Sequence, residues 1–543
     1  MATDFHGEFL RELAALDDYL ARREGERFVE PEDPDVRRLM ESLAFFSART
    51  RDAAAAELRS AVQRLTQGLL DDFVHPQPAR AMLRAIPSPR LTEPAVLPRG
   101  TRVRVETLDG EVGQFSTMHE LKVRPLELDR AELQLRGAGV RVLIRLRAYG
   151  PVVHVGEPLA MHIDHLGDYD ASCQLHHHLA KHLQRVGVVY GDSPAPSELG
   201  QACEFRFGAA QVGDAGFADE LRSQQRTGVI SRIREFFHFP GKDLSLAVEL
   251  ARPARPWRQA WLCLDLDEWP EHGVVNKEMF RLFMVPIENL FSELAEPIKC
   301  DGTRARHPIV AWRTEGDVAF HSVLEVEQEL ATGMDVILPG HIASGEESWD
   351  LDYDDEHRPE LILRLPGAFV DPRMVMVRAR WYQPNFDALA LGKLEATLHG
   401  RHVEGVGFRV QGGLVPHRVS PLSREPTAML HVLSRRSKRL LSREDIIMLM
   451  SVLGADAHGF HDVASELRRV EVTDEPAGVR GNGGIRHVYR VRLADVPEAR
   501  RGRVDDYLRC VELLLDAWSS NPVTIRIDEP TPRKRPEIVR SAS

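Results

Sequence analysis

Six histidines lie within one short stretch of the sequence, HIDHLGDYDASCQLHHHLAKH at residues 162–182. Neutral imidazole is a common ligand of transition metals, so this stretch could contribute to a metal site that supports hydrolysis. Such a site needs three or four donor atoms that point at one position, with further groups that orient them. The spacing of the histidines therefore decides whether metal chemistry is expected.

His178 and His182 are one helical turn apart and could in principle hold one metal ion. In a zinc protease helix a glutamate follows the first histidine, whereas here the following residue is Leu179. His176 and His177 would lie about 100° apart around a helix, so they cannot both point where His178 points. We therefore predict a partly packed helix flank, with no metal and no cofactor. A metal-dependent hydrolase that uses this segment is the alternative.

Two further segments begin like a known site and then depart from it. Asp350, Asp352 and Asp354 have the alternate spacing of a calcium loop, but Asp355 stands where that loop needs glycine. The glycine-rich segment GVRGNGGI, residues 478–485, lacks the Lys-Ser/Thr pair of a phosphate-binding loop and is typical of a hairpin loop. No Gly-x-Ser-x-Gly motif occurs. The sequence predicts a protein that is not an enzyme and has no catalytic residues.

The elements that carry the histidines are predicted from local patterns. The run VHVGEPLAMHIDHL is extended and ends at the turn signal Gly167-Asp168, and Asp170 is the expected N-cap of the next helix. The apolar stripe of that helix is expected at Leu175, Leu179, Leu183 and Val186.

Composition restricts the function classes. A chain of 543 residues is expected to form several domains, and none of its apolar runs approaches the 18 residues of a membrane span. The net charge of −12 disfavours general nucleic-acid binding, because phosphate binding needs a basic surface. Five scattered cysteines without a Cys-x-x-Cys motif, and an amino terminus without a hydrophobic signal core, predict a reduced cytoplasmic protein.

We predict an α+β, multidomain fold, with an N-terminal helical segment followed by β-rich mixed domains. Helical periodicity dominates the first residues, and alternating apolar positions begin at Thr101. The predicted regions are residues 1–75, which are helical; 76–100, a proline-rich joint; 101–325, a β-rich α+β middle region; 326–528, a C-terminal α+β region; and 529–543, a disordered tail.

The first helix, predicted from about Asp4 to Arg23, is a candidate partner interface. Its narrow apolar stripe comprises Phe5, Phe9, Leu13, Leu16 and Leu20. A helix of this length is only marginally stable alone, so the stripe needs a partner. That partner is either another chain, which we favour, or the second helix of this chain. The second helix is expected to begin at Pro34, with its own stripe at Val36, Leu39, Leu43 and Phe46.

The segment MFRLFMVPIENLFSELAEPI is a candidate structural joint rather than a ligand site. Its apolar side chains are expected to be buried and its prolines to fix turns of the chain. The joint residues are Phe280, Phe283, Pro286, Ile287, Leu290, Phe291 and Pro297. Elsewhere, ISRIREFFHFPGKDLSLAVEL predicts a helix, a turn at Pro240-Gly241 and a strand, and Ser442 with Asp445 predicts a capping box.

Several separated segments resemble the TssF family of the bacterial type VI secretion system. MFRLFMVPIENLFSELAEPIKCD is similar to the family pattern FxLxCTPxINLFxxxxEPI, and IREFFHFPGKDLSLAVEL is similar to a turn usually written with YFxFPEKF. The segment beginning DPDVRRLMESLAFFSAR is similar to DPHVERLLEGFAFLAAR. The resemblance extends from about Phe5 to Ile527.

This resemblance implies a structural component of the baseplate wedge. Its implied partners are a second copy of itself, TssG, TssE, TssK and the VgrG spike, with the sheath and Hcp tube assembling on the wedge ring. It further implies a cytoplasmic location, docked at the inner-membrane complex, without nucleic-acid binding or direct membrane insertion. A wedge protein of a phage-like contractile injection particle shares this architecture and is the alternative.

Overall fold

The structure is a computed structural model. It describes residues 5–22, 34–70, 75–137, 139–152, 156–165, 167–208, 228–269, 274–312, 317–330, 333–340, 342–343, 345–354, 358–389, 393–420, 426–456, 460–477 and 484–528. The chain forms two compact units: residues 1–76, 292–381 and 419–431 make the first, and residues 77–291, 382–418 and 432–543 make the second. The units interleave along the chain, whereas the predicted domains are consecutive ranges. The α+β fold class is confirmed.

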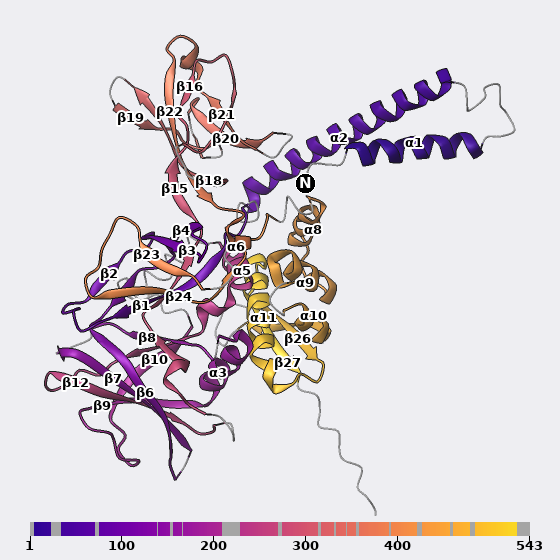
Figure 1. Ribbon diagram of the computed structural model, residues 1–543. Helices are drawn as coiled ribbons and strands as arrows, with labels where there is room; N and C mark the ends of the chain where they lie inside the picture. Colours follow the sequence, from indigo (N-terminus) through magenta and orange to yellow (C-terminus); the bar gives the residue numbers. More distant parts are fainter. Residues whose placement is uncertain are drawn as a thin grey trace, which may run out of the picture. The chain divides into compact units, whose positions relative to one another are not determined.

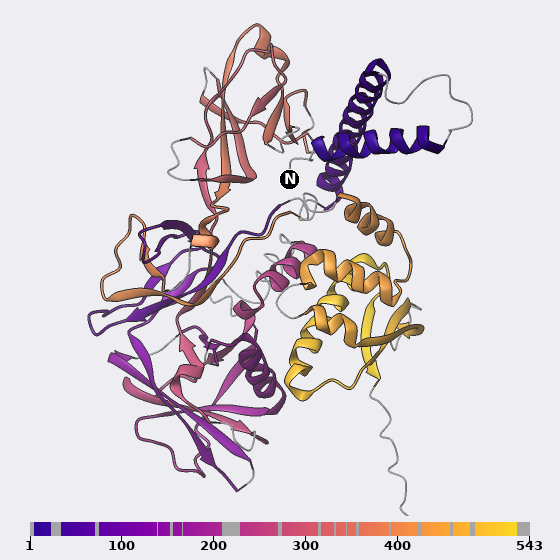
Figure 2. The same ribbon diagram turned by 45° about the vertical axis from the view of Figure 1, so that its right-hand side comes forward.

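The first unit contains a hairpin of two helices, α1 (Phe5–Arg22) and α2 (Pro34–Leu70), which pack against each other (Figures 1 and 2). Helix α2 begins at Pro34 as predicted, because proline suits the first helical position, where no N–H is needed. The prediction that Leu39, Leu43 and Phe46 lie on the buried face of α2 is wrong, because all three side chains are exposed. Met40, Ala44 and Ala48 are buried instead, and the small side chains of the two alanines allow close helix approach.

Two antiparallel sheets complete the first unit (Figure 1). One sheet has the order β15-β22-β18-β19, with β16 also pairing with β22. Its strands are β15 (Phe291–Leu294), β16 (Ile298–Cys300), β18 (Ala319–Leu330), β19 (Gly333–Val336) and β22 (Arg373–Tyr382). The other sheet contains β17 (Arg306–Pro308), β20 (Ser348–Tyr353) and β21 (Pro359–Arg364), and the short helix η4 spans Pro366–Phe369. Alternating burial along β22 is typical of a half-covered sheet.

A closed barrel of six strands forms part of the second unit, in the order β1-β14-β4-β3-β23-β24. The strands are β1 (Arg80–Pro87), β3 (Arg102–Glu106), β4 (Val112–Thr117), β14 (Met284–Glu288), β23 (Glu395–Leu398) and β24 (Val406–Val415). A separate pair joins β2 (Ala95–Leu97) to β5 (Leu121–Val123), and helix α6 spans Phe386–Leu389. Closure leaves the barrel without a free sheet edge.

An eight-stranded sheet follows, in the order β13-β8-β11-β10-β9-β12-β7-β6. Its strands are β6 (Leu126–Leu135), β7 (Val140–Val152), β8 (Leu159–Ile163), β9 (Leu183–Tyr190), β10 (Gln201–Phe207), β11 (Ser245–Glu249), β12 (Trp257–Leu266) and β13 (Phe280–Leu282). The helices are α3 (Tyr169–His182), α5 (Val229–His238), η2 (Pro240–Asp243) and η3 (Lys277–Met279). The predicted helix, Pro240-Gly241 turn and strand are confirmed as α5, η2 and β11.

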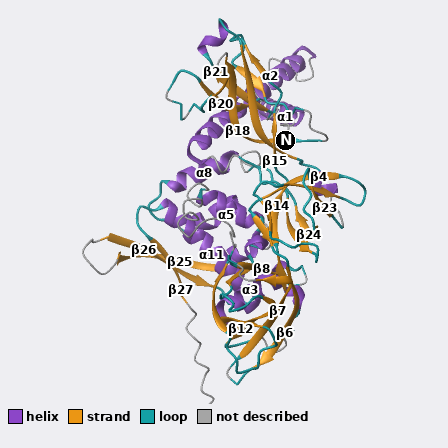
Figure 3. Cartoon of the chain, turned by 90° about the vertical axis from the view of Figure 1, so that its left-hand side faces the viewer, coloured by secondary structure: helices purple, strands orange, loops and turns teal. Residues whose placement is uncertain are grey.

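The last part of the second unit packs helices on a three-stranded sheet, β25-β26-β27 (Figure 3). Its strands are β25 (Leu467–Ala477), β26 (Gly484–Leu493) and β27 (Val523–Asp528). The helices of this region of the chain are α8 (Pro426–Arg436), α9 (Arg443–Met450), η5 (Ser451–Ala455), α10 (His461–Glu466) and α11 (Glu498–Trp518). The predicted capping box is confirmed at the start of α9, where Ser442 and Asp445 bond to each other's backbone N–H.

Some predictions fall outside the described residues. The predicted tail at residues 529–543 does so entirely, and the predicted glycine loop does so at residues 478–483, between β25 and β26. All five cysteines are free and buried. None of the described helices is both long and apolar enough to cross a membrane.

Candidate functional site

The histidine helix is α3, but its ends differ from the prediction. Asp168, not Asp170, is the N-cap, because its carboxylate accepts a hydrogen bond of 2.9 Å from the backbone N–H of Asp170. The helix ends at His182, where the N–H of Leu183 donates to the carbonyl of Leu179. Leu183 and Val186 therefore lie on strand β9 and not on a helical stripe.

The histidines of α3 face different partners. His176 packs edge-on against Phe207, with ring centroids 5.3 Å apart, and His177 Nε2 lies 3.5 Å from a carboxylate oxygen of Asp505 on α11. His178 and His182 stack at 4.4 Å between ring centroids. Their ring nitrogens bond to the Glu268 carbonyl at 3.1 Å and to Asp267 at 2.9 Å, respectively. Among the described residues, no group of three His, Cys, Asp or Glu side chains could hold a metal ion.

Close packing of α3 on α11 explains part of this arrangement. A Cβ atom built on Gly502 of α11 would lie 2.9 Å from the Cβ of His177, so only glycine fits there without movement. Burial lowers the pKa of His176 to about 4 and also lowers that of His178, so both rings are neutral at pH 7. These histidines behave as packing side chains, although the buried Nε2 of His176 has no hydrogen-bond partner among the described residues.

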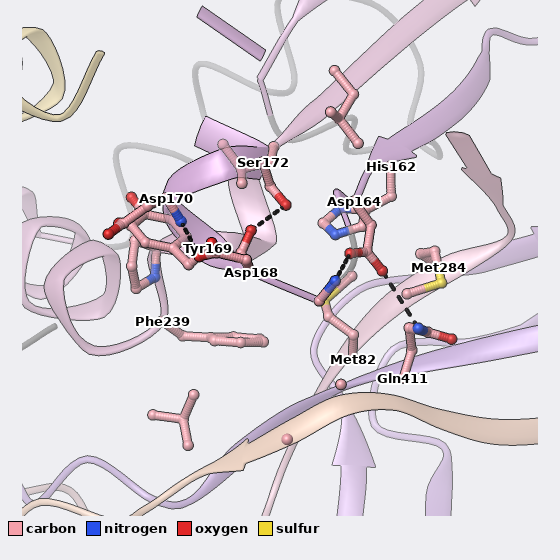
Figure 4. A pocket seen from close by; sticks show the side chains of 18 residues that line it. Met82, His162, Asp164, Asp168, Tyr169, Asp170, Ser172, Phe239, Met284 and Gln411 are labelled. Carbon is pink, nitrogen blue, oxygen red and sulfur yellow. Dashed lines mark hydrogen bonds between the residues drawn. The ribbon is translucent and has the colours of Figure 1, made fainter. Parts of the chain in front are cut away.

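A cavity of about 350 Å³ lies beside the start of α3, and Figure 4 shows its lining. Apolar side chains from the barrel strands and from the α5 turn form one part of the wall, including Met82, Met284 and Phe239. His162 and Asp164, at the end of β8, supply polar groups. The cavity therefore combines an apolar wall with a few polar groups, as small-molecule sites do.

The polar groups of this cavity are engaged in holding the fold. The Asp164 carboxylate accepts hydrogen bonds from the Gly167 N–H at 2.8 Å and the Gln411 amide at 3.4 Å (Figure 4). It also accepts from the Arg281 Nε at 2.7 Å. Ser172 Oγ donates to the Asp168 carbonyl at 2.6 Å. Burial lowers the pKa of His162 to about 4, so this ring is neutral at pH 7. The arrangement couples β8, β13 and β24 mechanically.

The aspartates that resemble a calcium loop are held by arginines. Asp350 and Asp352 lie on β20, where Arg364 and Arg306 approach them at 2.7 and 3.1 Å. Asp354 pairs with Arg358 at 2.7 Å. Protein cations therefore neutralise these carboxylates at least in part.

The candidate joint carries the chain directly from the eight-stranded sheet into the barrel. Phe280 lies on β13 and Ile287 on β14, and both side chains are almost fully buried. Phe283, between these two strands, is 6% exposed and has a positive φ of 57°. Bulky residues rarely adopt this conformation, so the backbone here is strained and held by its surroundings. The Phe283 carbonyl accepts from the Ala85 N–H of β1 at 2.9 Å.

The other predicted joint residues divide between core and surface. Leu290 and Phe291 are buried, whereas Pro297 is exposed between β15 and β16. Pro286 does not fix a turn as predicted, because it lies inside β14 opposite Met82. Its carbonyl accepts from the Met118 N–H at 2.9 Å, at the end of the β4 ladder, where the missing proline N–H is tolerated.

Sequence reasoning missed Asn289, the most completely buried polar residue of the joint. Its amide nitrogen donates to the Gln114 carbonyl and to the Gln383 side chain, both at 3.0 Å. A lone asparagine within an apolar run was the available signal, because buried amides need several partners. These bonds tie the joint to strand β4.

The N-terminal stripe lies partly within the helix hairpin. Phe9, Leu13 and Leu16 are half-buried, while the side chains of Phe5 and Leu20 lie outside the described part of the structure. Glu12 joins the helices by accepting from Ser47 Oγ at 2.8 Å and by pairing with Arg51. On α2, the side chains of Leu39, Leu43 and Phe46 are 64%, 52% and 65% exposed. They follow helical spacing, so one face of α2 is apolar and open.

Comparison with known protein families identifies one match. Residues 10–346, more than half of the chain, match the family described as "Type VI secretion system, TssF". A chain from the cryo-electron microscopy structure of the type VI secretion system TssK-TssF-TssG baseplate subcomplex is similar, with a TM-score of 0.71 and 16% identity. That match covers 91% of this chain and 96% of the other.

A chain of a second solved structure has a similar fold. A chain from the baseplate complex of the type VI secretion system matches with a TM-score of 0.64 and 15% identity, over 97% of both chains. No curated protein matches the sequence. At these identities the solved structures establish a shared fold, and the family match includes both α3 and the joint.

Proposed function

Because the chain belongs to the TssF family of the type VI secretion system, it is a structural component of that system's baseplate, and we propose that it builds the wedge together with TssG and a second copy of itself. The observation that carries this proposal is the family match over residues 10–346. The similarity of nearly the whole chain to chains of solved baseplate complexes supports it.

The proposed assembly has further members. TssK and TssE join the wedge, and the wedges surround the VgrG spike. The resulting ring is a cytoplasmic platform that docks at the inner-membrane complex, and the Hcp tube and the sheath polymerise on it. A subunit with this role needs large stable interfaces and rigid internal joints, and it needs no catalytic site.

The helix hairpin is the proposed partner-binding element. Leu13 is half-buried on α1, which packs against α2, so we infer that part of the α1 stripe stabilises the hairpin itself. The exposed row Leu39, Leu43 and Phe46 is the better surface for another chain, because a partner helix could bury it. Burial of large apolar side chains contributes about 25 cal/mol per Å² to association.

The joint has a mechanical role in this proposal. Phe283 and Asn289 fix the path of the chain from the eight-stranded sheet into the barrel, so the two modules transmit force as one body. The cavity beside α3 lies next to this joint, and its hydrogen-bonded carboxylate Asp164 links the same strands. Neither a cofactor nor a metal is required for such a role.

Co-expression with TssG and TssK from the same secretion system tests this function. An affinity tag on the chain should recover both proteins at fixed ratios through size-exclusion chromatography. A chain that elutes alone, while TssG and TssK are present and soluble, would contradict the proposal. Elemental analysis of the purified chain is the accompanying check, because zinc or iron at one equivalent would favour the hydrolase alternative.

A further inference from the structure

Strand β19 forms a free edge of the β15-β22-β18-β19 sheet (Figure 1). All four of its residues, Gly333–Val336, are exposed, although the strand pairs with β18 on one side. Exposed edges attract further strands, and proteins usually protect them with lysine, proline or a bulge. The β19 sequence Gly-Met-Asp-Val contains neither lysine nor proline, and its one charged side chain, Asp335, is hydrogen-bonded to Gln328 of β18. In the described part of the sheet, short length is the only protection that this edge has.

Among the described residues, no strand pairs with the outer side of β19. Just beyond the strand, the Trp349 N–H donates to the Leu338 carbonyl at 3.2 Å, so the unpaired edge ends before Leu338. The Ile337 N–H donates to the Val326 carbonyl at 2.9 Å, which makes this pair a hydrogen-bonded one. Hydrogen-bonded and non-hydrogen-bonded pairs alternate along an antiparallel ladder. Val336 and Met334 therefore form the non-bonded pairs with Glu327 and Glu329, and their N–H and C=O groups point away from β18.

The side chains of this edge alternate in the same way. Met334, Val336 and Leu338 are 51%, 50% and 47% exposed, and their spacing of two residues places them in one row. Glu327 and Glu329 lie directly opposite Val336 and Met334, so this apolar row is bordered by carboxylates on β18. On the other face, Asp335 accepts a hydrogen bond from the Gln328 amide at 3.2 Å, which fixes the register of the hairpin.

Acidic residues dominate the segment that contains this edge. Residues 317–354 contain ten Asp and Glu side chains and not one Lys or Arg. Arginines from neighbouring strands approach some of these carboxylates, as Arg373 does with Glu347 at 2.7 Å and Arg378 with Glu325 at 3.7 Å. Arginines also neutralise Asp350, Asp352 and Asp354. The negative charge at this edge therefore comes from Glu327, Glu329 and Asp335, and its field favours a basic partner.

We propose that β19 is a docking edge that takes an extended, basic segment of another baseplate subunit as an additional strand. This inference rests on the proposed function. The incoming strand satisfies the outward backbone groups of Met334 and Val336, and its apolar side chains pack in the row with Leu338. Its lysine or arginine side chains lie toward Glu327 and Glu329. Main-chain bonding supplies affinity, and the acidic border selects against acidic segments.

Two substitutions at one position test the edge in the full-length chain. Val336→Lys places a cation on the exposed row and should repel a basic strand. Val336→Pro removes only an outward N–H, so the ladder to β18 should stay intact. The matched control is Val370→Lys, because Val370 is 87% exposed and lies after η4 in the same unit. Circular dichroism and melting should be unchanged for all three variants.

The readout is complex formation with co-expressed TssG and TssK, measured by quantitative size-exclusion chromatography. Both Val336 variants should reduce the recovered complex at least tenfold, and Val370→Lys should leave it unchanged. The complex of the unsubstituted chain should also weaken when NaCl rises from about 0.1 M to about 1 M, because screening shortens the reach of the acidic field.

Three outcomes would overturn the inference. Equal recovery for Val336→Lys, Val336→Pro and Val370→Lys would refute the edge alone and leave the proposed function standing. Failure of the unsubstituted chain to bind TssG and TssK would refute both. An isolated chain that is a dimer, and that Val336→Lys converts to a monomer, would assign the edge to a second copy of the chain instead.

Discussion

The side chains of Asn289 and Gln383 are hydrogen-bonded to each other in the buried joint. Asn289 Nδ2 donates to Gln383 Oε1 at 3.0 Å, and the Gln383 backbone N–H donates to Asn289 Oδ1 at 2.6 Å. Gln383 in turn bonds to the backbone of β4 at two positions, accepting from the Gln114 N–H at 2.7 Å and donating to the Val112 carbonyl at 3.0 Å. Residues far apart in sequence are thus joined by one amide network, and a buried network of this kind specifies a single arrangement.

Asn289→Leu should destabilise the second unit by about 2–4 kcal/mol, because it removes three hydrogen bonds and leaves buried partners unsatisfied. Urea unfolding followed by tryptophan fluorescence would measure this change. The matched control is Asn276→Leu, since Asn276 makes one capping hydrogen bond at the half-exposed start of η3. An effect at Asn289 no larger than at Asn276 would argue against the network.

Phe283→Ala should destabilise the chain by about 3–5 kcal/mol, as large-to-small changes in a core do. Phe283→Gly removes the same ring but also relieves the positive φ, so it should be at least as stable as the alanine variant. A substitution by glycine normally destabilises a protein more than a substitution by alanine. A glycine variant that is at least as stable as the alanine variant would therefore indicate backbone strain at this position. A glycine variant clearly less stable than the alanine variant, by thermal melting, would show that the backbone is not strained here.

Leu13→Asp and Phe46→Asp should separate hairpin stability from partner binding. Leu13 is half-buried on α1, which packs against α2, so its replacement by a charge should lower helical content in the isolated chain. Phe46 is 65% exposed, so Phe46→Asp should keep the isolated fold yet lose most of the bound TssG. Circular dichroism and co-purification provide the two readouts. If Phe46→Asp bound TssG as well as the unsubstituted chain does, the exposed row on α2 would not be the interface.

Asp506→Asn should stabilise the chain at neutral pH. Burial of Asp506 raises the pKa of its carboxyl to about 6, with Arg509 acting in the opposite direction. In the unfolded chain the pKa of this carboxyl is about 3.9, so the unfolded chain releases the proton at a lower pH than the folded chain does. The folded state therefore loses stability between about pH 4 and pH 6.

The asparagine variant lacks this titration, so it should exceed the unsubstituted chain by about 1–2 kcal/mol at pH 7 and match it near pH 4. Urea midpoints at several pH values provide the measurement. Asp192→Asn, at an exposed aspartate, serves as the control. A stability difference for Asp506→Asn that does not change with pH would contradict this account.

Local chemistry made several elements predictable. Ser442 and Asp445 predict the start of α9, and Pro240-Gly241 predicts the turn between α5 and β11. Both were predictable because caps and turns depend on neighbouring residues alone. The end of α3 was mispredicted for a physical reason. Leu183 and Val186 continue a helical spacing but also open an apolar β-branched run, and short apolar runs fit either period.

Long-range pairing accounts for what the sequence did not predict. Strand β24 closes the barrel against β1 from more than 300 positions away, and no local pattern encodes that pairing. On α2 the visible leucine and phenylalanine row proved to be exposed, while the alanines Ala44 and Ala48 are buried. Burial followed the fit between two helices rather than side-chain size, so the candidate interface could be located only in the structure.

The central claim, that this chain is a structural subunit of the baseplate wedge, is tested most directly by the mass of its complex. Native mass spectrometry of the co-expressed proteins should show a species that contains two copies of this 61.2 kDa chain together with TssG. Phe46→Asp should reduce that species and Val370→Lys should not. A chain that stays at 61.2 kDa in the presence of soluble TssG would contradict the account.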